Sequence, residues 1–164
     1  MKNINWMKLL SAIAVCYLAA GIGSLFTVDS ISGWYATIHK PFFNPPNWVF
    51  GPVWTLLYTL MGISLYIVWQ KKHKATVKKN SLVVFFIQLG LNTLWSIIFF
   101  SYKLPAFALI EIILLWISIL ITIKYFKKIS PLAGVLLYPY IAWVSFATIL
   151  NAAIVLLNTW ALQR

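Results

Sequence analysis

The sequence predicts an all-α integral membrane protein built as a bundle of five transmembrane helices. Three observations lead to this prediction: 62% of the 164 residues are hydrophobic, only 9% are charged, and the apolar residues gather in long stretches. Because charged residues make up about 25% of a typical soluble domain, a soluble enzyme is excluded. The predicted spans cover residues 9–28, 48–69, 81–100, 104–123 and 132–157, and the whole chain, 1–164, is predicted to form a single membrane domain.

The predicted spans have the length that a bilayer requires. Each contains at least 20 residues, and about 20 apolar residues at 1.5 Å rise cross the roughly 30 Å hydrocarbon core. The first span has the basic start of a signal peptide, because Lys2 and Lys8 precede it. Its apolar run continues to Val28, beyond the roughly 7 to 15 residues of a signal core, so we expect it to remain as a transmembrane helix.

Two features of the spans bear on helix packing. Pro139, early in the fifth span, leaves the carbonyl of Val135 without its helical donor, so we expect a kink. In the first span, small residues recur every four positions, at Ala12, Cys16, Ala20 and Ser24. Such a stripe allows another helix to approach closely, either inside the bundle or between subunits.

The connections between spans differ in kind. Residues 101–103 force the third and fourth spans into a tight antiparallel pair, and Ser130 and Pro131 are typical of an N-cap and a first helical residue. The first connection, 29–47, contains Trp34, Tyr35, Phe42, Phe43, Pro41, Pro45 and Pro46. It is either an interfacial aromatic belt or a lid over the outer mouth of the bundle. We favour the lid, because proline stiffens the segment.

The basic residues are distributed unevenly across the membrane. The net charge is +11, and ten basic residues fall on one side (Lys2, Lys8, Lys71, Lys72, Lys74, Lys78, Lys79, Lys124, Lys127 and Lys128) against three on the other (Lys40, Lys103 and Arg164). By the positive-inside rule, the N-terminus is cytoplasmic and the C-terminus lies outside. This asymmetry accounts for the charge, so no nucleic-acid partner is expected.

Hydrolytic and metal chemistry lack candidate residues in this sequence. Cys16 is the only cysteine, and His39 and His73 fall on opposite sides of the membrane, so no metal site is predicted. No serine has both a histidine and an acid available. Glu111 is the only acid within a span. It is either a structural or pocket-edge residue or a functional one.

Polar and aromatic residues inside the spans form stripes that should face the bundle interior. The stripes are Trp54 and Tyr58 in the second span, Gln88, Asn92 and Trp95 in the third, and Trp143, Ala147, Asn151 and Asn158 in the fifth. Amides in such stripes either join helices by hydrogen bonds or line a ligand pocket. We assign Asn92, beside Trp95, to a pocket and leave both alternatives open for Gln88, Asn151 and Asn158.

Motifs rich in tryptophan, proline and asparagine run in order along nearly the whole chain. They are Trp34-Tyr35, Lys40-Pro41, Pro45-Pro46-Asn47-Trp48, Gly51-Pro52-Val53-Trp54, Leu57-Tyr58, Gln88-Leu89, Leu91-Asn92, Trp95, Phe99-Phe100, Tyr138-Pro139-Tyr140, Trp143, Phe146-Ala147-Thr148 and Leu150-Asn151. Together they resemble the translocator protein family, also called the tryptophan-rich sensory proteins. The resemblance implies a five-helix bundle, a homodimer, and a pocket beneath the first loop. The lysine-rich composition favours a bacterial member in the cell membrane.

The resemblance also implies a function and the residues that serve it. Relatives bind porphyrins such as protoporphyrin IX and aromatic drug-like molecules, and by motif position the ligand-binding residues are Trp54, Asn92, Trp143, Ala147 and Leu150. Trp54 and Trp143 match tryptophans implicated in light-dependent porphyrin breakdown, so they are the candidate catalytic residues. No cofactor is required, since the porphyrin is itself the ligand or substrate.

The resemblance leaves the physiological role open. It implies porphyrin transport, regulation or light-dependent degradation, and the alternative is a transporter or sensor of small apolar ligands that acts through a membrane partner. Ligand propionates are expected near His39 or Lys40. Cholesterol transport is not expected, because residues 150–154 lack the tyrosine and basic residue of the animal motif.

Overall fold

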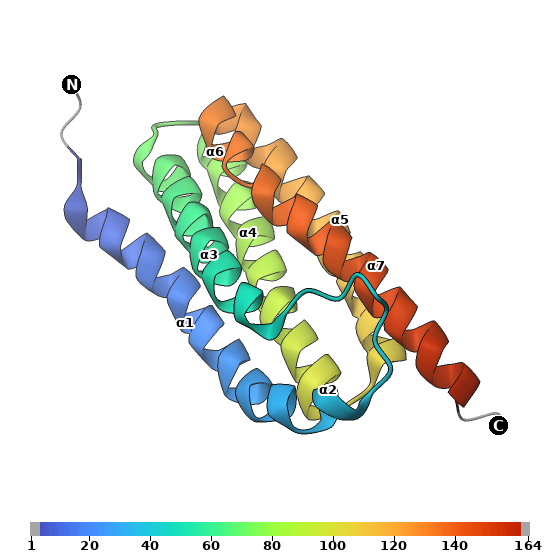
Figure 1. Cartoon of the computed structure of the whole chain (residues 1–164). Helices are drawn as coiled ribbons and strands as arrows, with labels where there is room; N and C mark the ends of the chain where they lie inside the picture. The colour runs from blue at the N-terminus through green and yellow to red at the C-terminus, as the bar shows by residue number, and fades with distance from the viewer. Residues whose placement is uncertain (1–3, 162–164) are drawn as a thin grey trace.

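The protein is a bundle of long helices with a folded connection across one end (Figure 1). A computed structural model describes residues 4–161, and this part of the chain contains helices and no strand. The long helices are α1 (Trp6–Ser32), α3 (Asn47–Gln70), α4 (Ala75–Ser96), α5 (Pro105–Ile129) and α7 (Tyr138–Ala161). The short ones are α2 (Trp34–Thr37), η1 (Ile97–Ser101) and α6 (Pro131–Val135). Lys2 and Arg164, used above for the orientation, lie outside the described residues.

The five predicted spans are confirmed as helices long and apolar enough to cross a membrane. They run from Trp6 to Ser32, Asn47 to Gln70, Ala75 to Ser101, Pro105 to Ile129 and Pro131 to Asn158. Most extend beyond the apolar stretches that predicted them. In α4 and α5 the added turns contain lysines, which are good helix formers. The chain is therefore a multi-pass membrane protein.

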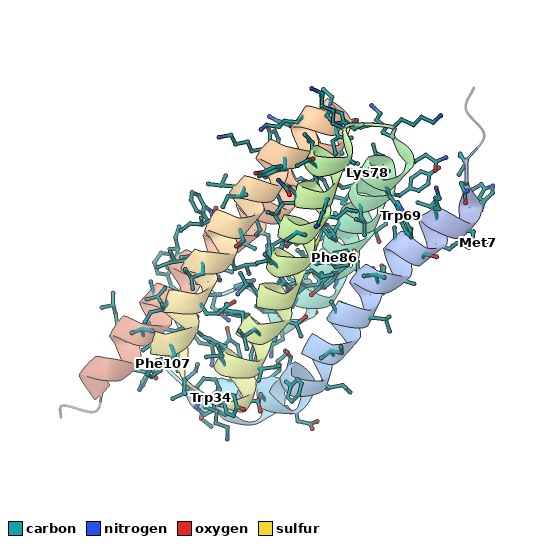
Figure 2. The ribbon with its side chains drawn as sticks, turned by 180° about the vertical axis from the view of Figure 1, so that it is seen from behind. Met7, Trp34, Trp69, Lys78, Phe86 and Phe107 are labelled. Atoms are coloured by element: carbon teal, nitrogen blue, oxygen red, sulfur yellow. The ribbon has the colours of Figure 1, made fainter. Side chains whose placement is uncertain are left out.

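Most lysines of the described residues gather at one end of the bundle, where α3 joins α4 and α5 joins α6. We call this the lysine-rich end, and the opposite end, crossed by α2 and the rest of the first loop, the cover end. Figure 2 shows Lys78 and Trp34 at these two ends. At the lysine-rich end the Lys71 ammonium donates to Ser130 Oγ (3.0 Å), and Ser64 Oγ donates to the carbonyl of Ala133 (2.6 Å). These bonds fix α6 against α3.

Two helices are irregular in ways that shape the cover end and the entry to α7. The third span finishes in η1, a π-helical turn that buries Phe99 and Phe100. The sequence did not predict this turn. The kink expected at Pro139 is a full interruption, since α6 ends at Val135 and α7 begins at Tyr138. Pro131 opens α6, as predicted, but the side chain of its N-cap residue makes no capping hydrogen bond.

The long helices α1 and α3 approach each other closely at Gly62. A Cβ added to Gly62 would stand 2.7 Å from Ile13 Cα, so only glycine fits between these backbones. Ala12 and Cys16 are completely buried on the same side of α1. The small-residue stripe of α1 therefore serves packing inside the chain over its first half.

Replacing Gly62 with alanine should destabilise the bundle. The new methyl group must push α1 away from α3, because its nearest neighbour is the backbone Cα of Ile13, and overpacking of this kind costs about 1–3 kcal/mol. Thermal unfolding in detergent should show a lower Tm for Gly62→Ala. The control is Gly90→Ala, where a Cβ meets nothing within 4 Å. Equal melting temperatures for the two variants would contradict the close contact.

Candidate ligand-binding cavity

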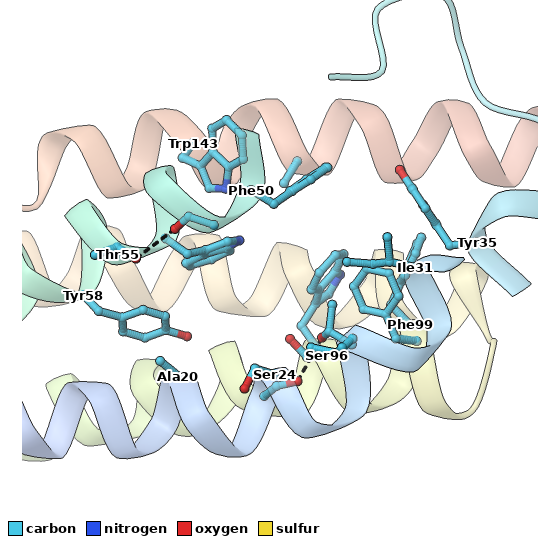
Figure 3. A pocket seen from close by; sticks show the side chains of 18 of the residues that line it. Ala20, Ser24, Ile31, Tyr35, Phe50, Thr55, Tyr58, Ser96, Phe99 and Trp143 are labelled. Atoms are coloured by element: carbon cyan, nitrogen blue, oxygen red, sulfur yellow. Dashed lines mark hydrogen bonds between the residues drawn. The ribbon is translucent and has the colours of Figure 1, made fainter. Parts of the chain in front are cut away.

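A cavity of about 470 Å³ lies inside the cover-end half of the bundle. Its walls come from α1, α3, the junction of α4 with η1, and α7. Tyr35 also reaches it from α2, which together with the rest of the first loop we call the cover. Figure 3 shows Trp143 entering from α7, opposite Ala20 and Ser24 of α1, with Tyr58 of α3 to one side. This volume lies within the range of roughly 300–1,000 Å³ that is typical of small-molecule sites.

The cavity walls are predominantly aromatic. Trp54 packs its ring 5.4 Å from Tyr58, and Trp95 stacks 4.9 Å from Phe99. Trp143 lies 6.0 Å from Phe50 and 5.5 Å from Phe146, in tilted and edge-on contacts. Ring faces and edges arranged in this way offer stacking and T-shaped contacts to a flat aromatic ligand.

Four of the five predicted ligand-binding residues line the cavity. Trp54, Trp143, Ala147 and Leu150 are part of its wall. Asn92 is not, because it lies behind Tyr58 in the bundle core. The tyrosine hydroxyl donates a short hydrogen bond to Asn92 Oδ1, and Asn92 Nδ2 donates to the hydroxyl of Tyr140 at 3.1 Å. Asn92 thus joins α3, α4 and α7, and holds Tyr58 in the wall.

The other predicted polar residues divide between interhelical bonding and burial. Asn151 Nδ2 donates to the carbonyl of Pro105 (2.7 Å), which ties α7 to α5, so this amide joins helices although it also borders the cavity. Gln88 and Glu111 are buried at 1% and 5% exposure. In residues 4–161, their side-chain polar atoms have no hydrogen-bond partner. Neither of these two residues lines the cavity.

The first loop closes the cover end by packing on α7 and η1. The His39 amide donates to Asn158 Oδ1 (3.1 Å), and Asn158 Nδ2 donates back to the His39 carbonyl (2.9 Å). Phe43 contacts the ring of Phe146. Ser30 Oγ donates to the carbonyl of Phe100 (2.8 Å), which fixes the start of the loop. The loop therefore has the geometry of the predicted lid.

The cover also has its own internal structure. Tyr35 is only 4% exposed, and its hydroxyl donates to Asn44 Oδ1 at 2.6 Å. Burial raises the pKa of Tyr35 to about 12, and the hydrogen bond to Asn44 offsets part of this rise. The Lys40 ammonium donates to the carbonyls of Tyr35 (2.7 Å) and Ile38 (3.1 Å). The Lys40 ammonium therefore bonds within the cover. Neither Lys40 nor His39, near which ligand propionates were expected, lines the cavity.

Several wall residues could not be assigned to the cavity from the sequence. Phe99 and Phe146 belong to the recognisable motifs, but Phe99 reaches the cavity through the unpredicted η1 turn. Ile31 and Phe50 carry no signal beyond their apolar character. Among residues 4–161, no three His, Cys, Asp or Glu side chains come together.

Comparison with known proteins decides the family. Residues 12–157 match the TspO/MBR family. This chain belongs to the TspO/MBR family. It is 48% identical over 157 residues to the tryptophan-rich protein TspO of Archaeoglobus fulgidus, covering 94% of this chain and 99% of that protein. It is 37% identical over 147 residues to the translocator protein of Homo sapiens, covering 89% and 87% of the two chains.

A third relative, the tryptophan-rich sensory protein of Cereibacter sphaeroides, is 36% identical over 156 residues, covering 95% of this chain and 94% of that protein. In all three comparisons the match extends over most of both chains. The similarity therefore includes α1, the cover, and the helices that build the cavity walls.

Replacing Asn92 with leucine separates its structural role from a role in ligand contact. The change leaves the hydroxyls of Tyr58 and Tyr140 without their amide partner, and a buried unpaired polar group costs about 1–3 kcal/mol. We expect a lower Tm, and the double variant with Tyr58→Phe should lose less than the two single losses added. An unchanged Tm with much weaker ligand binding would instead place Asn92 in direct contact with the ligand.

Proposed function

We propose that this TspO/MBR protein binds a planar tetrapyrrole of the protoporphyrin IX type in the cover-end cavity. The observation that carries the proposal is the cavity itself, which has a volume of about 470 Å³ and indole and phenyl walls from separate helices. A flat macrocycle suits such a site because it can stack on rings on more than one side. Contacts between its faces and these rings then contribute to the free energy of binding.

Transport and sensing both begin with this binding step. Relatives carry the names translocator protein and tryptophan-rich sensory protein, and both roles need a site that holds and releases a ligand. The family names therefore support a binding protein for small apolar ligands. A transporter would release the porphyrin across the membrane, and a sensor would signal its presence through a membrane partner.

We further propose a cell-membrane location in a bacterium, with the N-terminus in the cytoplasm and the chain paired as a homodimer. The support for the orientation is the concentration of lysines at one end of the bundle, since such residues favour the cytoplasmic side. The support for the homodimer is the family resemblance.

Light-dependent porphyrin breakdown is a second candidate function, favoured by the placement of Trp54 and Trp143. Both line the same cavity from different helices, and Trp54 lies 5.4 Å from Tyr58 and 6.4 Å from Tyr140, ring to ring. Indoles are readily oxidised, so a light-excited porphyrin held between them can take one electron from an indole. The reduced porphyrin passes this electron to dioxygen, which becomes superoxide, and the oxidised indole is restored by an electron from the macrocycle. Superoxide then adds to the macrocycle radical cation, so that dioxygen supplies the oxygen of the broken ring.

Filling the cavity should abolish binding. Ala147→Phe places a ring in the cavity wall, whereas Ala142→Phe adds the same ring to an exposed position of α7 outside the cavity. In a dark titration with protoporphyrin IX, followed by tryptophan fluorescence quenching, we expect Kd to rise by at least about tenfold for Ala147→Phe, or about 1.4 kcal/mol. Ala142→Phe should bind as the wild type does. Equal affinities in both variants would contradict binding in the cavity.

Replacing both cavity tryptophans with phenylalanine should separate binding from breakdown. Trp54→Phe with Trp143→Phe keeps aromatic walls but removes the easily oxidised indoles. We expect porphyrin to remain bound and its absorbance bands to persist under illumination in air. The matched control is Trp48→Phe with Trp69→Phe, which changes two exposed tryptophans outside the cavity. Breakdown at the wild-type rate in the cavity variant would rule out tryptophan-directed degradation.

A further inference from the structure

The walls of the cavity differ in how much they are shielded. Every exposed residue that lines it belongs to α1 or α3: Tyr17, Gly21, Ser24, Val28, Gly51 and Thr55. The lining residues of α4, η1 and α7 are all buried or half-buried. The cavity is therefore sealed on the side of α4 and α7 and open on the side of α1 and α3.

The opening results from the path that α1 takes across the bundle. Near the lysine-rich end α1 packs on α3 at Gly62, and its last hydrogen bonds to α3 come from the Tyr17 hydroxyl, which lies 3.2 Å from the carbonyl of Thr55 and 2.9 Å from Thr59 Oγ1. Beyond this point α1 is held to other elements. Thr93 Oγ1 of α4 lies 3.4 Å from the Ala19 carbonyl, and Ser30 Oγ donates to η1. α1 thus leaves α3 and crosses to α4 and η1.

Two glycines lie on the rims of the opening that this crossing creates. Gly21 lies on the α1 side and Gly51 on the α3 side, and a Cβ at either position would meet nothing within 4 Å. Gly21 is about 16 Å from the end of α1, and Gly51 is about 6 Å from the start of α3, at 1.5 Å per residue. Both glycines lie within helices that are long and apolar enough to cross a membrane, so the opening lies between two membrane-spanning helices.

The hydroxyl groups of the rim are hydrogen-bonded within their own helices. Ser24 Oγ donates to the carbonyl of Gly21 (2.8 Å), and Thr55 Oγ1 donates to that of Gly51 (2.9 Å). Thr27 Oγ1 likewise donates to Gly23 (2.9 Å). Because these hydroxyls are satisfied within their own helices, the rim can contact acyl chains or an apolar ligand without leaving a polar group unpaired.

The route through the cover, in contrast, is closed by packing and hydrogen bonds. Tyr35 is buried beneath it, the amide of Asn158 binds both backbone groups of His39, and Lys40 binds carbonyls inside the loop. A ligand entering from water at this end would have to break several of these bonds. A ligand dissolved in the bilayer meets an existing gap.

We infer that the cavity exchanges its ligand directly with the hydrocarbon of the bilayer, through the opening between α1 and α3 and past Gly21 and Gly51. The ligand class is a planar apolar molecule that partitions into lipid, such as a porphyrin with its ring in the membrane. This inference rests on the proposed function, namely that the cavity holds such a ligand. It assigns the cover the role of a fixed wall and α1 that of the boundary of the entrance.

Narrowing the opening should slow entry and exit together. The variant Gly21→Phe with Gly51→Phe places rings on both rims, and Gly90→Phe is the matched control on an exposed face of α4, where a Cβ also meets nothing within 4 Å. Each protein is reconstituted in lipid vesicles that contain protoporphyrin IX, and binding is followed in the dark by stopped-flow tryptophan quenching. We expect both the association and the dissociation rate to fall by at least about tenfold in the rim variant, whereas rings that only occupied the cavity would weaken binding by raising the dissociation rate.

The same experiment tests the competing route through the cover. Asn158→Ala removes the two hydrogen bonds that tie His39 to α7, and it should leave both rates unchanged. Faster exchange in Asn158→Ala together with wild-type rates in the rim variant would overturn the inference and place the entrance at the cover. Failure of the wild-type protein to quench at any porphyrin concentration would instead contradict the proposed function.

The entrance can also be tested without porphyrin, by the rate at which a cysteine in the cavity is modified. In a Cys16→Ser background, Ala147→Cys places the only thiol in the cavity wall. Lipid-dissolved N-phenylmaleimide should modify it faster than a charged, water-borne thiosulfonate does, and the rim phenylalanines should slow the lipid-borne reagent. Equal rates of modification by N-phenylmaleimide with and without the substitutions Gly21→Phe and Gly51→Phe would overturn the inference.

Discussion

The cavity exists because the two halves of the bundle are packed with side chains of different size. At the lysine-rich end, Gly62 lets the backbone of α3 touch α1 at Ile13, and the adjacent Ala12 and Cys16 are completely buried. At the cover end, bulky rings such as Trp54, Trp95 and Trp143 stand between the helices. These rings cannot interdigitate as small residues do, so the helices separate and enclose a space. The remaining features of the site follow from this change in packing along the bundle axis.

The separation is stable because polar groups hold the helices at fixed positions around the space. Asn92 binds two tyrosines from two different helices, and Asn151 ties α7 to the first residue of α5. Such bonds add to helix association in lipid, where burial of apolar surface gives no advantage between helices. At the end of the bundle, the hydrogen bonds between His39 and Asn158 likewise hold the cover against α7. These bonds therefore hold the walls of the cavity in place.

The fold could be predicted from the sequence because it depends on patterns that are local in the chain. Apolar stretches predicted the five spans, and Pro131 marked the start of α6. The interruption before Pro139 was underestimated, because a lost hydrogen bond predicts a bend but not its extent. The π-helical turn η1 was missed since the sequence 97–101 reads as an ordinary continuation of the third span.

The cavity could be predicted only in part, because its walls depend on which faces of separate helices meet. The motif resemblance and the interior stripes both indicated Trp54, Trp143 and Ala147, which do line it. Asn92 lay on the same stripe as Trp95, yet the amide faces the tyrosines of the core while the indole borders the cavity. The open side between α1 and α3 could not be foreseen, since no property of α1 alone shows that it crosses from α3 to α4.

The most direct test of the account is a structure of the protein with protoporphyrin IX, determined in a lipid nanodisc in the dark. The account predicts a single macrocycle enclosed between Trp54 of α3 and Trp143 of α7, with one edge at the gap beside α1. A macrocycle bound only on the lipid-facing surface, with the cavity filled by rearranged side chains at saturating porphyrin, would contradict it.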